Sequence, residues 1–349
     1  MKTKEFQSIL KKKKIDFALF YNTDTTRTEA NMFYFSQYRG IGALIIPKNK
    51  TPFLIVPEME LGREKNCKAH AWTKDHKLFK SVKKRIKGKR IAIDKNLFTI
   101  NDYKALKKQF RKAKFIDISE TISRIRETKT KEEIKIIKRA CKISDNILKT
   151  AIKNLKRFRT ETELAGWLEY EAKKLGCDLA FPTVVASGKN SAVPHHSPKN
   201  TKLRGFCVID FGIKYKGYCS DTTRTVYIGK PDKKEKYIYN LLLKTQKSAI
   251  KQIRTGAKCS GIVKYVIKSL SRYNKYMTHG LGHGFGINIH ELPNLKEKSN
   301  DIFKENMVFT IEPGVYFKNK FGIRIEDDIL LAKKGPEILT KTNKELITI

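Results

Sequence analysis

Two aspartates occupy apolar, strand-prone stretches of the chain, where a carboxylate is costly to bury. Asp210 lies in the run VIDFG (208–212), and Asp221 lies in the run SDTTR (220–224). The β-branched and aromatic residues around Asp210 predict a buried strand. An unpaired buried charge costs more free energy than a strand can return, so each carboxylate needs a partner. The obvious partner for two neighbouring carboxylates is a metal ion.

The segment KYKGY (214–218) between the aspartates predicts a tight turn, because its glycine can adopt a positive φ. If Tyr215 and Lys216 form the loop, Asp210 and Asp221 lie opposite each other on one face of an antiparallel hairpin. A bulge at Gly217 would shift this pairing by one residue. Facing carboxylates repel each other unless a cation lies between them.

The chain has 349 residues, enough for two domains that each bury their own core. No apolar run reaches membrane-spanning length, and the first residues show no signal-peptide pattern. The six cysteines form no Cys-x-x-Cys pair and are expected as buried thiols in a reducing compartment. We therefore expect a cytoplasmic protein with no membrane partner.

The formal net charge of +39 raises the question of a nucleic-acid partner. The basic residues are dispersed along the chain, apart from the run Lys11–Lys14, which we expect at a helix end. Dispersed lysines are typical of a lysine-biased composition, with charged ends in solvent and aliphatic stems over apolar surface. We expect salt-sensitive, non-specific attraction to polyanions, and no specific nucleic-acid partner.

Residues 1–127 are predicted to form an α/β domain. Strand-prone runs alternate there with helical segments. The predicted elements are strands at 16–21, 90–93 and 114–117, a hairpin of 41–46 with 51–56, and a helix over 100–111. This domain carries no group of residues that points to chemistry.

Residues 128–349 are predicted to form a second domain of helices and strands around the hairpin 206–228. Three N-terminal capping patterns predict its long helices. They are Thr130 with Glu133, Thr160 with Glu163 before a helix that stops at Gly176, and Asp232 with Glu235 before a helix to about Arg254.

Three further segments of this domain carry carboxylates or histidines in the same unusual setting. They are HGLGHGFG (279–286), TIEPG (310–314) and RIEDD (324–328). A single residue of this kind is usually salt-bridged or solvated. Together, however, four carboxylates and one imidazole could balance the charge of two divalent cations. Oxygen-rich ligand sets with one nitrogen suit Mn, Co, Fe or Zn.

The ordered motifs DFG, SDTTRT, HGLGHGFG, IHE, TIEPG and RIED resemble the pita-bread metallopeptidases. That family includes methionine aminopeptidase, Xaa-Pro aminopeptidase, Xaa-Pro dipeptidase (prolidase) and creatinase. The resemblance covers about residues 181–330 and implies an α+β pita-bread catalytic domain over 128–349. Residues 1–127 resemble the creatinase/prolidase N-terminal domain.

The resemblance implies a role for each candidate site residue. The implied metal ligands, with Asp221 and Glu326 as the bridging carboxylates, are Asp210, Asp221, His283, Glu312 and Glu326. The implied catalytic residues are His195 and His290, which would contact the substrate near the scissile carbonyl, and Glu312, which would carry the proton to the leaving nitrogen. The implied pocket or substrate-binding residues are His279, Arg324 and His196. His196 is also the alternative to His195 in the catalytic role.

The implied function is an exopeptidase that cleaves between an N-terminal residue and proline, as an Xaa-Pro aminopeptidase or an Xaa-Pro dipeptidase. Two divalent ions would share a hydroxide that attacks the peptide carbonyl. One alternative is an activity like that of methionine aminopeptidase, although those enzymes generally resemble only the second domain. Another is a non-catalytic peptide- or nucleic-acid-binding module, although such proteins have typically lost ligands. The resemblance also implies a homodimer.

Overall fold

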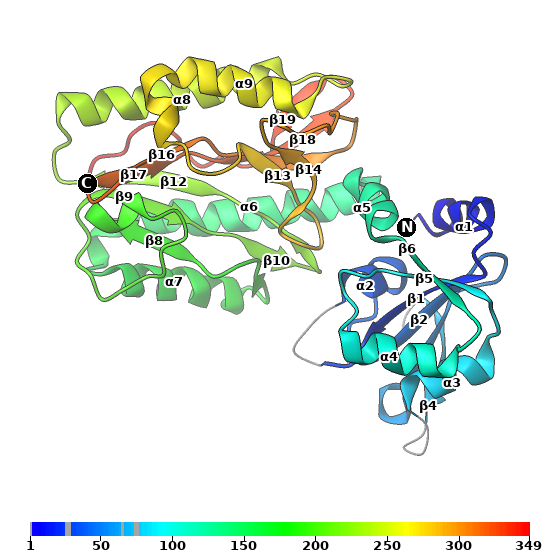
Figure 1. Cartoon of the computed structure of the whole chain (residues 1–349). Helices are drawn as coiled ribbons and strands as arrows, with labels where there is room; N and C mark the ends of the chain where they lie inside the picture. Colours follow the sequence, from blue (N-terminus) through cyan, green and yellow to red (C-terminus); the bar gives the residue numbers. More distant parts are fainter. Residues whose placement is uncertain (1, 25–28, 64–65, 73–76) are drawn as a thin grey trace. The chain divides into compact units, whose positions relative to one another are not determined.

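The computed structural model describes residues 2–24, 29–63, 66–72 and 77–349, which belong to two units, Met1–Ile125 and Arg126–Ile349 (Figure 1). The first unit contains a six-stranded sheet in the order β4-β3-β2-β1-β5-β6. Its strands are β1 Phe17–Asn22, β2 Gly42–Pro47, β3 Phe53–Pro57, β4 Lys68–Trp72, β5 Arg90–Ile93 and β6 Lys114–Asp117. Strands β1, β2 and β3 pair antiparallel, and the outer pairings are parallel.

Helices accompany this sheet, as expected of an α/β domain. They are α1 Thr3–Lys12, α2 Ala30–Ser36, α3 Leu78–Arg85, α4 Ile100–Gln109 and α5 Ser119–Glu127. The lysine run after residue 10 lies at the end of α1, as predicted. Strands β1 and β2 are buried at every position, so they form the centre of the unit's core.

The second unit begins with two helices whose start points the sequence predicts. Helix α6 spans Lys131–Lys153, and Thr130 forms the expected capping box with Glu133. Helix α7 spans Glu161–Lys174, and the Thr160 hydroxyl accepts a hydrogen bond from the Glu163 amide. Later in the chain, α8 spans Lys233–Gln252 behind the capping box of Asp232, and α9 spans Cys259–Leu270.

The strands of this unit form several small sheets between the helices. One sheet has the order β12-β9-β8, another β14-β13-β15-β18-β19, and two smaller ones are β11-β10-β7 and β16-β17. The strands are β7 Asp178–Leu179, β8 Val184–Ser187, β9 Gly205–Asp210, β10 Ile213–Tyr215, β11 Tyr218–Cys219, β12 Thr223–Ile228, β13 Gly282–Gly284, β14 Glu291–Leu295, β15 Val308–Ile311, β16 Gly314–Phe317, β17 Phe321–Arg324, β18 Asp327–Ala332 and β19 Gly335–Ile338.

Helices cover this layer of strands on both sides, with α8 and α9 on one side and α6 and α7 on the other (Figure 1). Strand β9 contributes to both apolar cores. Its Phe206 packs with residues of α8 and α9, whereas Cys207 and Ile209 pack with residues of α6 and α7. A strand that is buried on both faces holds the residue at its end rigidly, and that residue is Asp210.

The predicted register of the central hairpin is wrong. The turn residues are Lys216 and Gly217, with φ of 48° and 89°, and Asp210 pairs with Thr223 rather than with Asp221. Two positive φ angles suit a two-residue hairpin loop, and glycine adopts such an angle without strain, which explains why the turn includes Gly217. Asp221 lies between β11 and β12, outside the paired strands.

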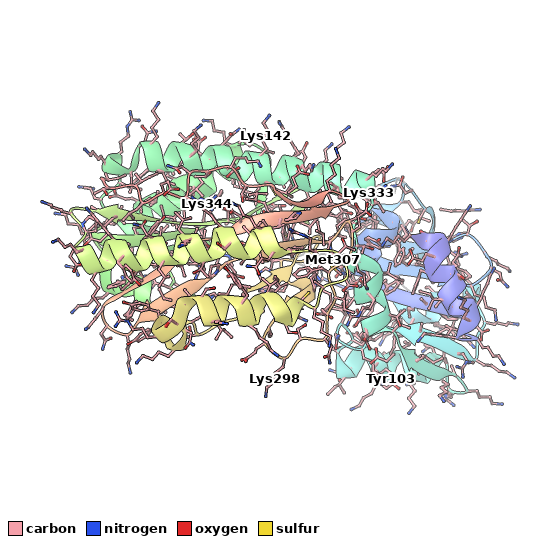
Figure 2. All side chains as sticks on the ribbon, turned by 90° about the horizontal axis from the view of Figure 1, so that it is seen from above. Tyr103, Lys142, Lys298, Met307, Lys333 and Lys344 are labelled. Carbon is pink, nitrogen blue, oxygen red and sulfur yellow. The ribbon has the colours of Figure 1, made fainter. Side chains whose placement is uncertain are left out.

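The positive charge is dispersed over the surface of the second unit. In Figure 2, Lys142 on α6 and Lys298 beyond β14 lie at opposite edges of this unit, and both residues are exposed. No helix within the described ranges is both long enough and apolar enough to cross a membrane.

Candidate metal centre

Three carboxylates from distant parts of the chain meet at the centre of the second unit. Asp210 ends β9, Asp221 follows β11, and Glu326 lies between β17 and β18. One oxygen atom from each lies within 4.8 Å of the other two. The two aspartates therefore meet although they are not paired across the hairpin.

His283 and Glu312 complete the cluster. The Nε2 atom of His283 lies 3.6 Å from Asp221 Oδ2 and 3.5 Å from Glu312 Oε1. All five side chains line one cavity of about 610 Å³. The structure thus brings together every residue that the sequence nominates as a metal ligand.

The glycines around His283 explain how its strand reaches this position. A Cβ atom on Gly282 would lie 2.1 Å from the carbonyl oxygen of Thr310, and one on Gly284 would lie 2.0 Å from that of Leu292. Only glycine allows β13 to approach its neighbours this closely. The motif GHG is therefore required to place the His283 ring in the cavity.

Three carboxylates of the cluster resist ionisation. Burial, and then the negative charges of Glu326 and Asp210, raise the pKa of Asp221 well above its usual range. The pKa of Glu326 is also raised well above its usual range, first by burial and then by Glu312 and Asp210. Burial raises the pKa of Glu312 to about 7. A cation between these groups would remove the repulsion that causes part of these shifts.

The His283 imidazole is suited to metal binding. Burial, together with the neighbouring His290, lowers the pKa of His283 to about 4, so the ring is neutral near pH 7. Its Nδ1 atom lies 3.2 Å from the carbonyl oxygen of Gly284 and therefore carries the proton. The lone pair is then on Nε2, the atom that faces Asp221 and Glu312.

An unpartnered oxygen supports the fit of this donor set to metal ions. Asp210 Oδ2 accepts a hydrogen bond from Arg324 at 2.6 Å, whereas the buried Asp210 Oδ1 has no hydrogen-bond partner among the described residues. Buried polar atoms normally have a partner, so an orphaned carboxylate oxygen inside a carboxylate cluster fits a cation ligand.

The two candidate histidines at positions 195 and 196 differ in their environments. His195 is exposed and lines the cavity. His196 also lines it but is buried, with Nε2 2.9 Å from Glu161 Oε2. His290 is exposed at the cavity wall, with its ring centroid 4.4 Å from that of His283.

Arg324 and His279 lie in the cavity wall, where each has protein partners. Besides Asp210, Arg324 donates to the hydroxyl groups of Thr223 and Tyr316 and to the carbonyl oxygen of Pro194. The ring of His279 lies with Nε2 2.9 Å from the Tyr316 hydroxyl. These bonds orient both side chains within the site.

Sequence reasoning missed three features of this region. Lys296 lines the cavity, Tyr316 links His279 to Arg324, and Glu161 binds the segment around His196. Glu161 stands in a helix-start pattern, TETE, where an acidic residue is common without any further role.

Removal of divalent metal by EDTA is expected to lower the melting temperature by about 5–15 °C, because a ligand that binds only the folded state stabilises it. Metal removal should also destabilise the fold because the charges of the carboxylate cluster repel each other without a cation. Differential scanning calorimetry with and without EDTA measures the shift, with metal content determined by elemental analysis. An unchanged melting curve after confirmed metal removal would contradict a metal centre at this position.

Comparisons with known proteins identify the family of this chain. Metallopeptidase family M24 matches residues 135–333, and the creatinase/prolidase N-terminal domain matches residues 2–128. The Xaa-Pro dipeptidase of Pyrococcus furiosus is 35% identical over 324 residues, which cover 91% of this chain and 92% of that protein. An uncharacterised peptidase of Staphylococcus epidermidis is 34% identical, covering 98% of this chain and 99% of that protein.

Solved structures give the same result. The prolidase from Pyrococcus horikoshii superposes with a TM-score of 0.90 at 33% identity, covering 99% of both chains. The X-Pro aminopeptidase from Thermotoga maritima superposes with a TM-score of 0.89 at 32% identity, covering 96% of this chain and 98% of that chain. The expected fold is confirmed. This chain therefore belongs to metallopeptidase family M24, as a metallo-exopeptidase of the pita-bread fold with a creatinase/prolidase N-terminal domain.

Proposed function

We propose that this chain hydrolyses the bond between an N-terminal residue and proline, using two divalent ions held by Asp210, Asp221, His283, Glu312 and Glu326. The observation that carries the proposal is the meeting of these side chains in one cavity with the exposed histidines His195 and His290. The relatives named as Xaa-Pro dipeptidase, prolidase and X-Pro aminopeptidase support the same substrate class.

The protein's own groups have distinct parts in this reaction. When bound, divalent ions supply an activated water and polarise the peptide carbonyl. His195 and His290 would donate hydrogen bonds to the carbonyl oxygen as it gains negative charge. The Thr310 hydroxyl lies 3.2 Å from Glu312 Oε1, so Oε2 of Glu312 is the oxygen left to carry a proton to the proline nitrogen.

Hydrolysis assays test the proposal directly. Protein loaded with Mn²⁺ or Co²⁺ should cleave Xaa-Pro dipeptides or Xaa-Pro-Yaa tripeptides, with methionyl peptides that lack proline as the control. Cleavage of the methionyl peptides alone would show an activity like that of methionine aminopeptidase. Failure to cleave any peptide after confirmed metal loading would reject the enzymatic proposal.

We further propose that dipeptides are preferred over longer peptides. Among the described residues that line the cavity, the lysine and arginine side chains are those of Lys296 and Arg324. Arg324 is bound to Asp210, whereas Lys296 is exposed. Lys296 lines the same cavity as His290, and burial, followed by the charges of His195 and Lys296, lowers the pKa of His290. The Lys296 ammonium could therefore bind the C-terminal carboxylate of a dipeptide substrate.

Replacement of Lys296 by methionine is expected to lower kcat/KM for Xaa-Pro dipeptides by roughly 10- to 100-fold, the loss of one charge-assisted hydrogen bond. Tripeptides should change less than about 3-fold, because their carboxylate lies one residue further along the substrate. The matched control is Lys298→Met, since Lys298 is exposed on the same segment but outside the cavity lining. An equal loss for dipeptides and tripeptides would contradict this role for Lys296.

Two expectations from the sequence stay predictions. The homodimer can be tested by light scattering coupled to size-exclusion chromatography. The cytoplasmic location can be tested by fractionation of the native cells.

A further inference from the structure

One carboxylate outside the metal centre organises the segment that carries His195. Glu161 is the first residue of α7, and its side chain is completely buried. Four donors reach it, all from residues 187–199. They are Ser187 N at 2.7 Å and Asn190 Nδ2 at 2.9 Å on Oε1, and His196 Nε2 at 2.9 Å and Lys199 N at 3.0 Å on Oε2.

Helix capping does not explain this arrangement. The cap of α7 is Thr160, whose hydroxyl accepts from the Glu163 amide, and a first-turn glutamate needs only solvent to be stable. A fully buried carboxylate must instead be compensated by strong hydrogen bonds. Glu161 makes those bonds to two backbone amides and two side chains of a segment that lacks a strand pairing of its own after β8.

The bonds surround His195 on both sides. The residue before it, Pro194, is held through its carbonyl oxygen by Arg324 at 3.2 Å. The residue after it, His196, is held through its ring by Glu161. The backbone of His195 is thus fixed by its two neighbours, while its own side chain is exposed at the cavity.

We propose that Glu161 and His196 are positioning residues that fix His195 for its contact with the substrate carbonyl, an inference that rests on the proposed function. Neither residue is required to touch the substrate or the metal ions. A displacement of about 1 Å of a catalytic group can reduce a rate about 100-fold, so such support has a measurable effect.

The first test is Glu161→Gln, which preserves shape but turns an amide nitrogen toward groups that are themselves donors. We expect kcat/KM for an Xaa-Pro substrate to fall about 10- to 100-fold with metal content unchanged. The matched control is Glu163→Gln in the same helical turn, where Glu163 pairs with the exposed Arg159. At position 196, His196→Gln retains a nitrogen donor and should lose less activity than His196→Phe.

A double-mutant cycle separates positioning from general structural support. In a His195→Ala background, Glu161→Gln should cause no further loss of kcat/KM, because its effect passes through His195. The same fold-loss in both backgrounds, or a loss of bound metal, would overturn the proposal.

Hydrogen exchange gives a readout that is independent of activity. At least one of the amides of Ser187 and Lys199, which donate to different oxygens of Glu161, should exchange at least about 10-fold faster in Glu161→Gln than in the wild type, since glutamine keeps a single acceptor oxygen. If the wild type cleaves no peptide but Glu161→Gln still exchanges faster than the wild type, the proposed function fails and the positioning contacts stand. If the wild type is active and Glu161→Gln matches it in both exchange and kinetics, the positioning proposal fails alone.

Discussion

Replacement of Asp221 by asparagine is expected to lower the hydrolysis of Xaa-Pro peptides by at least about 1000-fold, the effect of losing several kcal/mol of metal-assisted stabilisation. Asp221 shares the cluster with Asp210 and Glu326 and faces His283 at 3.6 Å. An amide is a weaker ligand than a carboxylate and carries no charge to balance the cations. Kinetic assays and metal analysis of the purified variant measure both losses.

The same substitution should stabilise the metal-free protein against unfolding. The pKa of Asp221 is raised by burial and by neighbouring carboxylates, so a neutral asparagine removes a repulsion. Metal-free Asp221→Asn should therefore melt at a higher temperature than metal-free wild type. Asp178→Asn is the matched control, because Asp178 is exposed and pairs with Lys173. An active Asp221→Asn variant with a full metal complement would contradict the ligand assignment.

Replacement of Glu291 by glutamine is expected to lower the free energy of unfolding by about 3–5 kcal/mol, as for other buried ion pairs that lose one partner. Glu291 Oε1 accepts from Arg126 and Oε2 accepts from Lys129 at 2.9 Å. The exposed fractions of these side chains are 7% for Glu291, 8% for Arg126 and 1% for Lys129. Glutamine would remove the negative charge that Glu291 supplies to these two buried cations.

The pKa of Glu291 determines how the stability difference between wild type and Glu291→Gln changes with pH. Burial alone would raise the pKa of Glu291, but Arg126 and Lys129 outweigh it and lower the pKa from 4.5 to about 2. A lowered folded-state pKa contributes stability that is fully present above pH 4.5 and is lost as the pH falls through about 2. The difference in stability between wild type and Glu291→Gln should therefore shrink as the pH is lowered from 6 to 3.

Thermal or urea unfolding at pH 6 and pH 3 measures this difference. The matched control is Glu337→Gln, since Glu337 forms an exposed pair with Lys138, with exposed fractions of 44% and 42%. Exposed pairs contribute only about 0–1 kcal/mol, so this variant should resemble the wild type at both pH values. Equal destabilisation by the two variants would contradict a special role for the Glu291 network.

Glu291 also shows why local patterns miss some long-range contacts. It follows His290 directly, and the sequence marks both through the motif IHE, but Arg126 lies 165 residues away. No spacing in the chain connects these residues. Lysine and arginine make up 74 of the 349 residues, so neither Arg126 nor Lys129 stands out as the partner of a buried acid.

The helix starts at Thr130 and Asp232 and the buried strand ending at Asp210 could be predicted from the printed residues, because capping and periodicity are local properties. The candidate metal ligands are nominated by the resemblance of the ordered motifs to a family, and the structure brings them into one cavity. The hairpin register, the bond between Arg324 and Asp210, and the four bonds to Glu161 could not be predicted. Each depends on which distant segments share a core, and the Arg324–Asp210 bond alone spans 114 residues. Local chemistry therefore nominates the carboxylates, and packing of the strands between two helical layers decides which atoms face one another.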